Sequence, residues 1–567
     1  MTYRPPFKKH IAELAAPAAG TDAARLESLI EVPPDTRLGE YALPCFILAK
    51  ERRQAPPKIA AELAAQVKPD HVVESITAVG PYVNFRLHTA ALAGSVLPAV
   101  IAAGAAYAAG GPAGKVVVDY SSPNIAKQLG IGHLRSTVIG NALARTLAHL
   151  GNAVVRINHL GDWGTQFGYM ITAWKRWGSE AELEREPIAH LMDLYVKANA
   201  AKDPEIEAAA RSEFKKLEDG DAEALALWKR FRELSLREFH TFYDEIGVTF
   251  DSEDGEAFFE DKMAAALALL ADRGLTEISE GALVVPMGED KKPALLKKSD
   301  GATLYLTRDI AAALYRLKTY QPDRLIYVVG VPQKQHFQEL FTILERLDPA
   351  NKEKFVHVDF GHYRFPEGKM STRTGNIVKL NDLFDRGAEL ALEKIKEKNP
   401  ELEDKDKVAR QVSLGAVIFS DLATDRVKDV VFDWDKVLDF DGDTAPYVMF
   451  AHVRARGILR KLAEEGIGAD IARLDTAALA HEHERKLLTQ LAQLRDVLDS
   501  VARTLKPHTL AQYALDLARV YHRFCHDCPV FRAEGSLREA RLLLTQAVAS
   551  TLKLAMTLLG VPAPDRM

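Results

Sequence analysis

The stretch from Val116 to Gly168 constrains the fold of this chain more than any other. It opens with the β-branched run VVV at 116–118, which favours a buried strand. At 121–124 the sequence SSPN breaks the strand, because the residue before proline avoids the helical region. A glycine-containing loop then leads into an amphipathic helical pattern over Leu134–Leu150, and a second strand is expected over Ala153–Ile157. This order predicts the opening unit of a parallel nucleotide-binding sheet, with an anion held at the helix N-terminus.

Length and composition indicate a multidomain soluble protein. At 567 residues the chain exceeds a single hydrophobic core, and about three or four domains are expected. Lysine and arginine number 73 against 79 aspartate and glutamate residues, a net charge of −6, so a nucleic-acid partner would need a local basic surface. Three cysteines exclude a disulfide scaffold and favour a reducing, cytoplasmic location. The prolines and charges near the N-terminus do not fit a signal peptide.

The uncharged stretch between Thr89 and Lys115 raises the question of a membrane span. Alanine and glycine dominate it and Pro98 lies inside it, so it lacks the leucine-rich hydrophobicity that insertion needs. We therefore expect a packed helix followed by a glycine linker there, and no membrane partner.

The remaining sequence changes from mixed patterns to almost wholly helical ones. Helices are expected at 35–49 and 57–67, and a strand with an internal Gly-Pro turn at 76–87. A charged helical segment of roughly 172–272 interrupts the predicted sheet, which resumes in GALVVP, ATLYLTRDIAAAL, RLIYVVG and FVHVDFG. Beyond Asn381 amphipathic helices follow one another to the C-terminus. These changes divide the chain into four expected domains, at 1–112, 113–380, 381–446 and 447–567.

Several segments resemble the arginyl-tRNA synthetases, a family of class I aminoacyl-tRNA synthetases. SSPNIAKQLGIGHLRST resembles their first signature, and RINHLGDWGTQFG resembles the segment that follows it. GEYALPCFILAK and GPYVNFRL resemble their N-terminal domain, and the C-terminal helices resemble their anticodon-binding domain. The chain departs from the class I pattern His-x-Gly-His at one position, because Gly130 replaces the first histidine.

The resemblance implies a multidomain α/β fold. Its catalytic domain would be a parallel, Rossmann-like nucleotide-binding domain with a helical insertion. An N-terminal α+β domain would contact the tRNA elbow, a helical linker at 381–446 would contact the tRNA stem, and the C-terminal all-α bundle would bind the anticodon.

The activity that the resemblance implies is ATP-dependent attachment of L-arginine to tRNA(Arg). The reaction would pass through an arginyl-adenylate and release AMP and pyrophosphate, with ATP and Mg²⁺ as substrate and no permanent cofactor or structural metal. Because the arginine carboxylate attacks the α-phosphate in line, the site needs positioning groups, donors and cations rather than a nucleophilic side chain. We expect the protein to be a monomer.

Phosphate-binding residues are expected in two segments. His133 lies in the first turn of the predicted helix, where the dipole favours an anion, and Lys127 precedes it as a point charge. GKMSTRTG at 368–375 resembles a relaxed form of the second class I signature, Lys-Met-Ser-Lys-Ser, and its Lys369 and Arg373 would clamp the β- and γ-phosphates. The other expected ATP-binding residues are Gly130, Gly132, His336, Met370 and Ser371.

A guanidinium substrate needs carboxylates and a polar pocket. The positions that match the arginine-binding residues of the family are Asp119, Asn124, Tyr305, Asp309 and Gln333. All five are expected at the carboxyl ends of parallel strands, the usual ligand crevice. Without the resemblance, Asp309 would be read as a helix N-cap and Asp119 as a polar strand end.

Contacts with tRNA are expected near both ends of the chain. Tyr82 and Asn84 lie two apart in a strand and hence on one face, where a ring and an amide could stack on and read an extruded base. Without the resemblance they would indicate a buried tyrosine and a turn asparagine. Tyr447 and Met567 are the expected contacts in the anticodon-binding domain.

Two alternative functions fit parts of the sequence. A synthetase-derived tRNA-binding or regulatory protein would explain Gly130, but Lys127, His133 and Lys369 are all retained. A small nucleotidyltransferase would share the phosphate loop but not the helical C-terminal region. The CHDC segment at 525–528 resembles half a zinc site, yet no second ligand pair follows it, so no metal site is expected.

Overall fold

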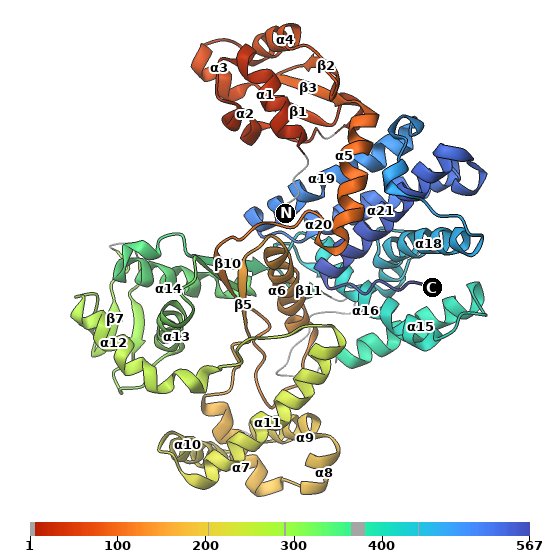
Figure 1. Ribbon diagram of the computed structural model, residues 1–567. Coiled ribbons are helices and arrows are strands. Elements are labelled where there is room, and N and C mark those ends of the chain that lie inside the picture. Colours follow the sequence, from red (N-terminus) through yellow and green to blue (C-terminus); the bar gives the residue numbers. More distant parts are fainter. Residues whose placement is uncertain (1–5, 34, 202, 289–290, 365–379, 440) are drawn as a thin grey trace.

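The computed structural model describes residues 6–567, apart from residues 34, 202, 289–290, 365–379 and 440. Figure 1 shows a separate N-terminal lobe, a central sheet with a helical insertion at the opposite end of the molecule, and a helical bundle that contains the C-terminus. The helix α5 (Thr89–Ala103) runs from the N-terminal lobe into the bundle.

The N-terminal lobe, residues 6–87, is an antiparallel sheet covered by helices. Its strand order is β1-β3-β2. Val83, Phe85 and Leu87 on the central strand are fully buried, whereas the side chain of Arg86 between them is partly exposed. The elements are α1 (Phe7–Ala19), α2 (Ala23–Leu29), β1 (Tyr41–Pro44), α3 (Phe46–Arg52), α4 (Pro56–Gln66), β2 (Val73–Val79) and β3 (Tyr82–Leu87).

The helix predicted at 35–49 is wrong, whereas the helix predicted at 57–67 is confirmed as α4. The first segment contains a short 3-10 turn at Thr36–Leu38, the strand β1 and the start of α3. Gly39, with φ +126°, brings the backbone so close to β3 that a Cβ would lie 2.5 Å from the Phe85 carbonyl oxygen. This close approach and Pro44 favour a paired strand over a continuous helix.

The central sheet has four parallel strands in the order β10-β9-β4-β5. After β4 the chain passes through α6 to β5 on one side, and it later returns to β9 on the other side of β4. The order therefore reverses between β4 and β9, and ligands bind at such a switch point beyond the carboxyl ends of the strands. The bounds are β4 (Lys115–Asp119), α6 (Ile131–His149), β5 (Ala153–Ile157), β9 (Arg324–Gly330) and β10 (Phe355–Phe360).

A long insertion separates β5 from β9. Its helical part extends from Thr165 to Asp272 and thus begins slightly before the predicted segment. The helices are α7 (Thr165–Trp177), α8 (Glu180–Arg185), α9 (Pro187–Ala200), α10 (Pro204–Glu218), α11 (Ala222–Glu245) and α12 (Met263–Asp272). A small antiparallel sheet follows, made of β6 (Glu277–Ser279), β7 (Ala282–Val285) and β8 (Ala294–Lys297).

Two of the four segments predicted to resume the parallel sheet do not belong to it. GALVVP forms β7 of the small antiparallel sheet, because Gly281, with φ +79°, turns the chain directly from β6 into β7. ATLYLTRDIAAAL contains only an isolated bridge at Thr303 before α13 (Tyr305–Tyr320) begins. RLIYVVG and FVHVDFG are confirmed as β9 and β10.

Beyond Asn381 the described residues are almost wholly helical, as predicted. The two-residue strands β11 (Tyr363–Arg364) and β12 (Val430–Val431) pair in parallel. The helices after β9 are α14 (Lys334–Leu347), α15 (Leu380–Lys398), α16 (Lys405–Ala423), α17 (Trp434–Val437), α18 (Ala445–Glu464), α19 (Glu482–Thr504), α20 (His508–Asp527) and α21 (Gly535–Leu559). A single buried hydrophobic cluster extends from the N-terminal lobe through α6 into α18–α21.

Two helices, Thr89–Ala106 and Gly535–Leu559, have the length and apolar composition of a membrane span. The second is 78% buried inside the bundle. The first packs against α19 and α21 and buries Leu92, Val96 and Val100. The helix predicted between Thr89 and Lys115 is therefore present, and protein covers the face that packs on α19 and α21, although only 28% of this helix is buried.

Candidate active site

The first signature places His133 in the first turn of α6. The Gly130 N–H donates to His133 Nδ1 at 3.2 Å, and the His133 N–H donates to the Gly130 carbonyl at 2.9 Å. Burial, helped by the nearby charge of Lys127 and opposed by the hydrogen bond to Gly130, lowers the pKa of His133 to about 4. A neutral ring that accepts at Nδ1 carries its proton on Nε2, which can then donate to an anion at the helix N-terminus.

The loop that precedes α6 is held by the insertion. Ser121, Ser122 and Ala126 all have positive φ, at 74°, 51° and 58°. Such conformations cost energy in non-glycine residues and persist only where the surroundings fix them. Here the Ser121 hydroxyl pairs with the Tyr243 hydroxyl at 2.8 Å, and the Ala126 N–H donates to Ser235 Oγ at 2.8 Å, both on α11.

Lys127 leaves this loop and lies over the ring of Tyr195 on α9, with Nζ 5.2 Å from the ring centroid. Burial lowers the pKa of Lys127. The insertion therefore shapes the environment of the lysine that the sequence assigns to a phosphate.

Asp119 ends β4 and is already ion-paired inside the protein. Arg316 of α13 donates from Nη1 to Asp119 Oδ2 at 2.7 Å, and the Ser122 hydroxyl donates to Oδ1 at 3.1 Å. Arg316 is 2% exposed and its Nη2 lies 3.2 Å from His159 Nδ1. Burial alone would lower the pKa of Arg316, but Asp119 raises it above its ordinary value. This buried pair joins the switch-point strand to α13.

Asp309, in the second turn of α13, contacts His336 of α14. His336 Nε2 lies 2.6 Å from Asp309 Oδ2, and the ring of Tyr305 lies 4.9 Å from the His336 ring. Burial alone would raise the pKa of Asp309, but His336, His159 and Arg316 lower it on balance. Asp309 is therefore an ionised carboxylate whose side chain keeps 30% of its surface exposed.

The structure brings most of the predicted arginine-binding residues to one edge, with two corrections. Tyr305 and Asp309 lie in the first two turns of α13 and not at the end of a parallel strand. Asp309 is not the N-cap either, because that position is Leu304. Gln333 follows β9 as predicted and is exposed.

Asn124 is held against the segment that follows β5. It forms an isolated parallel bridge with Gly161, and a Cβ at Gly161 would lie 2.2 Å from Asn124 Oδ1. A glycine is therefore required at the centre of the HLGDWG segment for the two loops to meet.

The second signature lies outside the described residues, which end at Arg364 and resume at Leu380 on either side of it. The expectations for Lys369, Met370, Ser371 and Arg373 therefore stay predictions.

Comparison with known proteins gives three matching family models. The class I (R) tRNA synthetase catalytic domain matches residues 96–434, the DALR anticodon binding domain matches 448–567, and the arginyl tRNA synthetase N terminal domain matches 6–87. The chain belongs to the arginyl-tRNA synthetase family. The C-terminal bundle is thus a DALR domain and the parallel sheet a class I catalytic domain, as the sequence predicted.

Relatives in this family match along their whole length. The arginine–tRNA ligase of Clostridium perfringens is 42% identical over 567 residues, covering 99% of this chain and 100% of the relative. That of Clostridioides difficile is 43% identical over 547 residues, covering 96% of each. The solved arginyl-tRNA synthetase of Thermus thermophilus has a TM-score of 0.84 at 28% identity and covers 99% of this chain and 100% of that one.

The N-terminal residues assigned to tRNA in this synthetase differ in their access to solvent. The Tyr82 ring is partly exposed and lies 5.8 Å, edge to face, from the exposed Phe46. Asn84 is only 1% exposed, so its amide is buried in the lobe, and its contact with tRNA stays a prediction. Its Nδ2 has no hydrogen-bond partner among the residues that the structure describes.

The two predicted residues of the DALR domain lie in defined contacts. The Tyr447 ring lies 4.8 Å from the His522 ring, and His522 stacks on Phe450, which is 45% exposed. The Met567 carbonyl accepts a hydrogen bond at 3.2 Å from Nδ2 of Asn399, the residue that follows α15.

Sequence reasoning missed Arg135, two residues after His133. Its side chain is 1% exposed, lies 3.7 Å from the Asp421 carboxylate, and donates to the carbonyls of Gly361 at 2.9 Å and Arg426 at 3.1 Å. It thus ties the signature helix to the segment after β10 and to α16. Arg316 was also missed, although its spacing of seven from Asp309 on a helix places both on one face.

Proposed function

We propose that this chain is an active arginine–tRNA ligase that forms arginyl-adenylate from L-arginine and ATP and transfers the arginyl group to tRNA(Arg). The observation that carries the proposal is that the switch point has two sets of binding groups, one for each substrate. The α6 N-terminus offers donors and a cation to phosphates, and the ionised Asp309 offers an acceptor to a guanidinium.

The phosphate side uses positioned donors. His133 Nε2–H and the free N–H groups of the first turn of α6 face an anion at the helix end, and Lys127 adds a positive charge. The space beside Gly132 is open, because a Cβ there would meet no atom within 4 Å. Lys369 and Arg373 are proposed to hold the leaving pyrophosphate, and Mg²⁺ is proposed to arrive with ATP.

The arginine side is assigned mainly to Asp309. Both oxygens of Asp119 already accept from Arg316 and Ser122, so Asp119 contributes by keeping Arg316 charged and in place. Tyr305, 62% exposed above His336, is proposed to cover the substrate, and Gln333 and Asn124 to complete the polar pocket.

Contact with tRNA is proposed at the exposed rings of the N-terminal lobe and of the DALR domain. Phe46 and Tyr82 present an aromatic edge that suits stacking with a base of the tRNA elbow. The buried Asn84, two residues after Tyr82 on the same strand, has no hydrogen-bond partner for its Nδ2 in the described structure. Tyr447 and Phe450 offer a second such surface for the anticodon. We further propose a cytoplasmic monomer.

An arginylation assay tests the proposal directly. The purified chain, ATP, Mg²⁺ and labelled arginine should charge tRNA(Arg), and omission of ATP or replacement of arginine by lysine should abolish the signal. Binding of tRNA without charging would instead favour a regulatory tRNA-binding protein that has lost its activity with the first signature histidine.

A further inference from the structure

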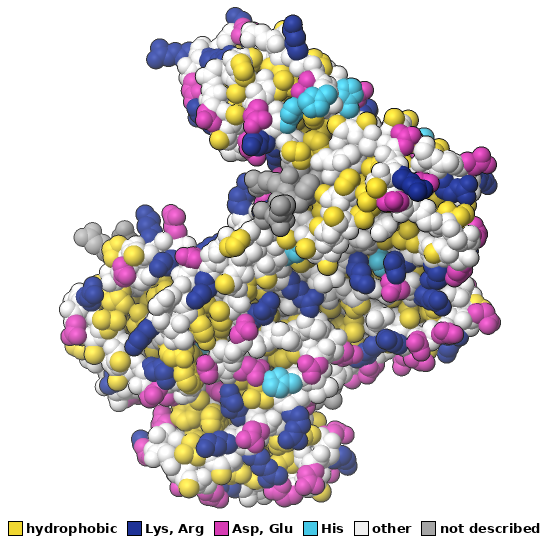
Figure 2. Space-filling model, viewed as in Figure 1, with side chains coloured by type: hydrophobic (Ala, Val, Ile, Leu, Met, Phe, Trp, Pro, Cys, Tyr) yellow, Lys and Arg dark blue, Asp and Glu magenta, His cyan; other side chains and the backbone are white. Residues whose placement is uncertain are grey.

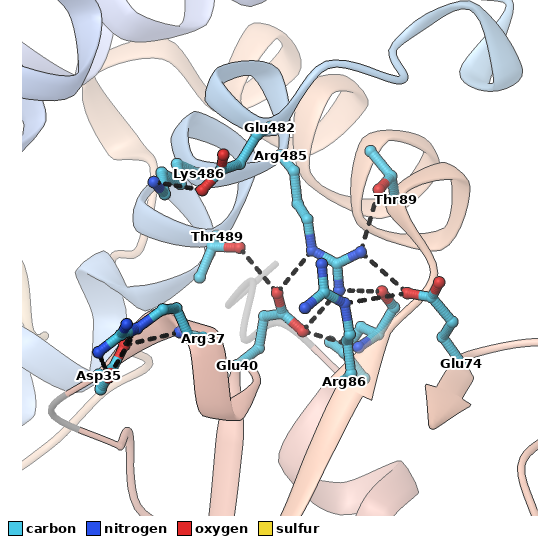
Figure 3. Close-up of polar contacts among 11 residues, drawn as sticks. Asp35, Arg37, Glu40, Glu74, Arg86, Thr89, Glu482, Arg485, Lys486 and Thr489 are labelled. Atoms are coloured by element: carbon cyan, nitrogen blue, oxygen red, sulfur yellow. Dashed lines mark hydrogen bonds and ion pairs between the residues drawn. The ribbon is translucent and has the colours of Figure 1, made fainter. Parts of the chain in front are cut away.

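Arg485 lies at the centre of the contact between the N-terminal lobe and the helical bundle (Figure 3). It projects from the first turn of α19, and its side chain is 11% exposed. Its Nε and Nη2 donate to the two oxygens of Glu40 at 3.0 and 3.1 Å. Nη2 also donates to the Leu87 carbonyl at 2.7 Å, and Nη1 donates to Glu74 Oε2 at 2.9 Å. One guanidinium therefore holds three separate segments of the lobe.

Glu40 is itself fixed within the lobe. Its Oε2 accepts from the Leu87 N–H at 2.7 Å, and its own N–H donates to the Phe85 carbonyl at 3.0 Å. Thr489, one turn after Arg485, donates to Oε1 at 3.4 Å. Arg485 is thus bound to the sheet of the lobe through a carboxylate whose own position is fixed by hydrogen bonds.

Apolar packing and polar contacts both join the lobe to the bundle, and the polar contacts are the directional ones. A second ion pair joins Lys8 to Asp496 at 2.8 Å, eleven residues and so about 16 Å further along α19. Around this second contact, and beyond it along α19, lies a groove of about 820 Å³, lined from the lobe by Glu27, Glu31 and Tyr41 and from α19 by Gln493, Asp499 and Arg503. Figure 2 shows the molecule hollowed on one side between the N-terminal lobe and the rest of the protein.

The covalent connection between the N-terminal lobe and α5 does not by itself fix the orientation of the lobe. A single residue, His88, with extended backbone angles of φ −63° and ψ 131°, joins β3 to α5. Rotation about such a junction is limited mainly by what the two sides contact. The directional bonds of Arg485, which meets Leu87 and Thr89 on both sides of the junction, supply that limit.

We propose that Arg485 is a positioning residue for tRNA binding. It holds the N-terminal lobe at the angle at which the lobe and the DALR domain bind one tRNA at the same time. The inference rests on the proposed function, because it assumes that both parts bind the same RNA. When the lobe and the DALR domain are held at a fixed angle, an RNA bound to one of them is already placed to bind the other. Loss of that angle therefore lowers the affinity for an RNA that spans both parts, but not for an RNA that contacts only one.

The test compares two RNAs on the full-length chain. We expect Arg485→Ala to raise the Kd for intact tRNA(Arg) about tenfold and to leave the Kd for a hairpin of its anticodon stem and loop unchanged. Arg485→Lys should give an intermediate value, because an ammonium cannot form the same fork with Glu40. Arg25→Ala is the matched control, since Arg25 pairs with Glu51 inside the lobe.

Three results would contradict the proposal. In the first, Arg485→Ala raises the Kd of both RNAs equally, which would mean local damage to α19. In the second, it raises neither Kd. In the third, Arg25→Ala has the same effect as Arg485→Ala. If Arg485→Ala does not fold, Glu74→Gln replaces it, because Glu74 is 42% exposed and holds only one guanidinium nitrogen. A wild-type chain that binds tRNA but never charges it would refute the proposed function, and the comparison of the two RNAs would still test Arg485.

Discussion

Asp309→Asn separates recognition of arginine from recognition of ATP. The substitution keeps the shape of the side chain and removes its charge, and the charge is present at neutral pH because His336, His159 and Arg316 lower the pKa of Asp309. Removing one partner of a hydrogen-bonded charge pair costs about 2–5 kcal/mol. Since the side chain keeps 30% of its surface exposed, we expect the lower part of that range, about 2–3 kcal/mol.

This loss corresponds to a rise of about 30- to 150-fold in the KM for arginine. The KM for ATP should change by less than about threefold, because the phosphate groups bind at the other side of the switch point. Steady-state arginylation with each substrate varied in turn measures both constants. Asp272→Asn, at the exposed end of α12, is the control for a lost surface charge. An arginine KM within about threefold of the wild-type value would refute the assignment of the guanidinium to Asp309.

Three further substitutions test other parts of the site. Lys369→Ala should slow adenylation in a rapid-quench assay and leave the arginine KM nearly unchanged, because its proposed partner is the departing pyrophosphate; an unchanged rate would leave Lys127 as the cation responsible. Gly130→His should change the adenylation rate by less than about tenfold. The φ of −105° at this position suits any residue, and Lys127 with Lys369 compensates for the missing donor. A hundredfold gain in rate would show that the donor had never been replaced. Arg316→Met should lower the free energy of unfolding, measured in urea, by about 3–5 kcal/mol, because Asp119 would remain buried without its ion-pair partner. Arg37→Met removes an exposed ion pair and should have almost no effect. Equal effects of the two substitutions would contradict the importance of the buried pair.

The sequence by itself determined the local units and the family. Its β-branched runs, glycine loop and amphipathic helix predicted β4, α6 and β5, because hydrophobic period and turn residues are local properties. The signature segments predicted the class I catalytic domain, and the C-terminal helices predicted the anticodon-binding domain; the family models confirm both. The resemblance to the family also selected Lys127, His133 and Asp309 as site residues, whose roles remain proposals.

Only the tertiary structure decided which side chains are already committed to partners. Asp119 is predictable as a polar strand end, but its pairing with Arg316 spans 197 residues and depends on how α13 packs beside β4. GALVVP has the pattern of a buried strand in either sheet, and the turn at Gly281 directed it into the antiparallel one. Glu40 and Arg485 lie 445 residues apart, each in an ordinary local pattern. Contacts of this kind arise from the packing of whole elements, so no local pattern predicts them.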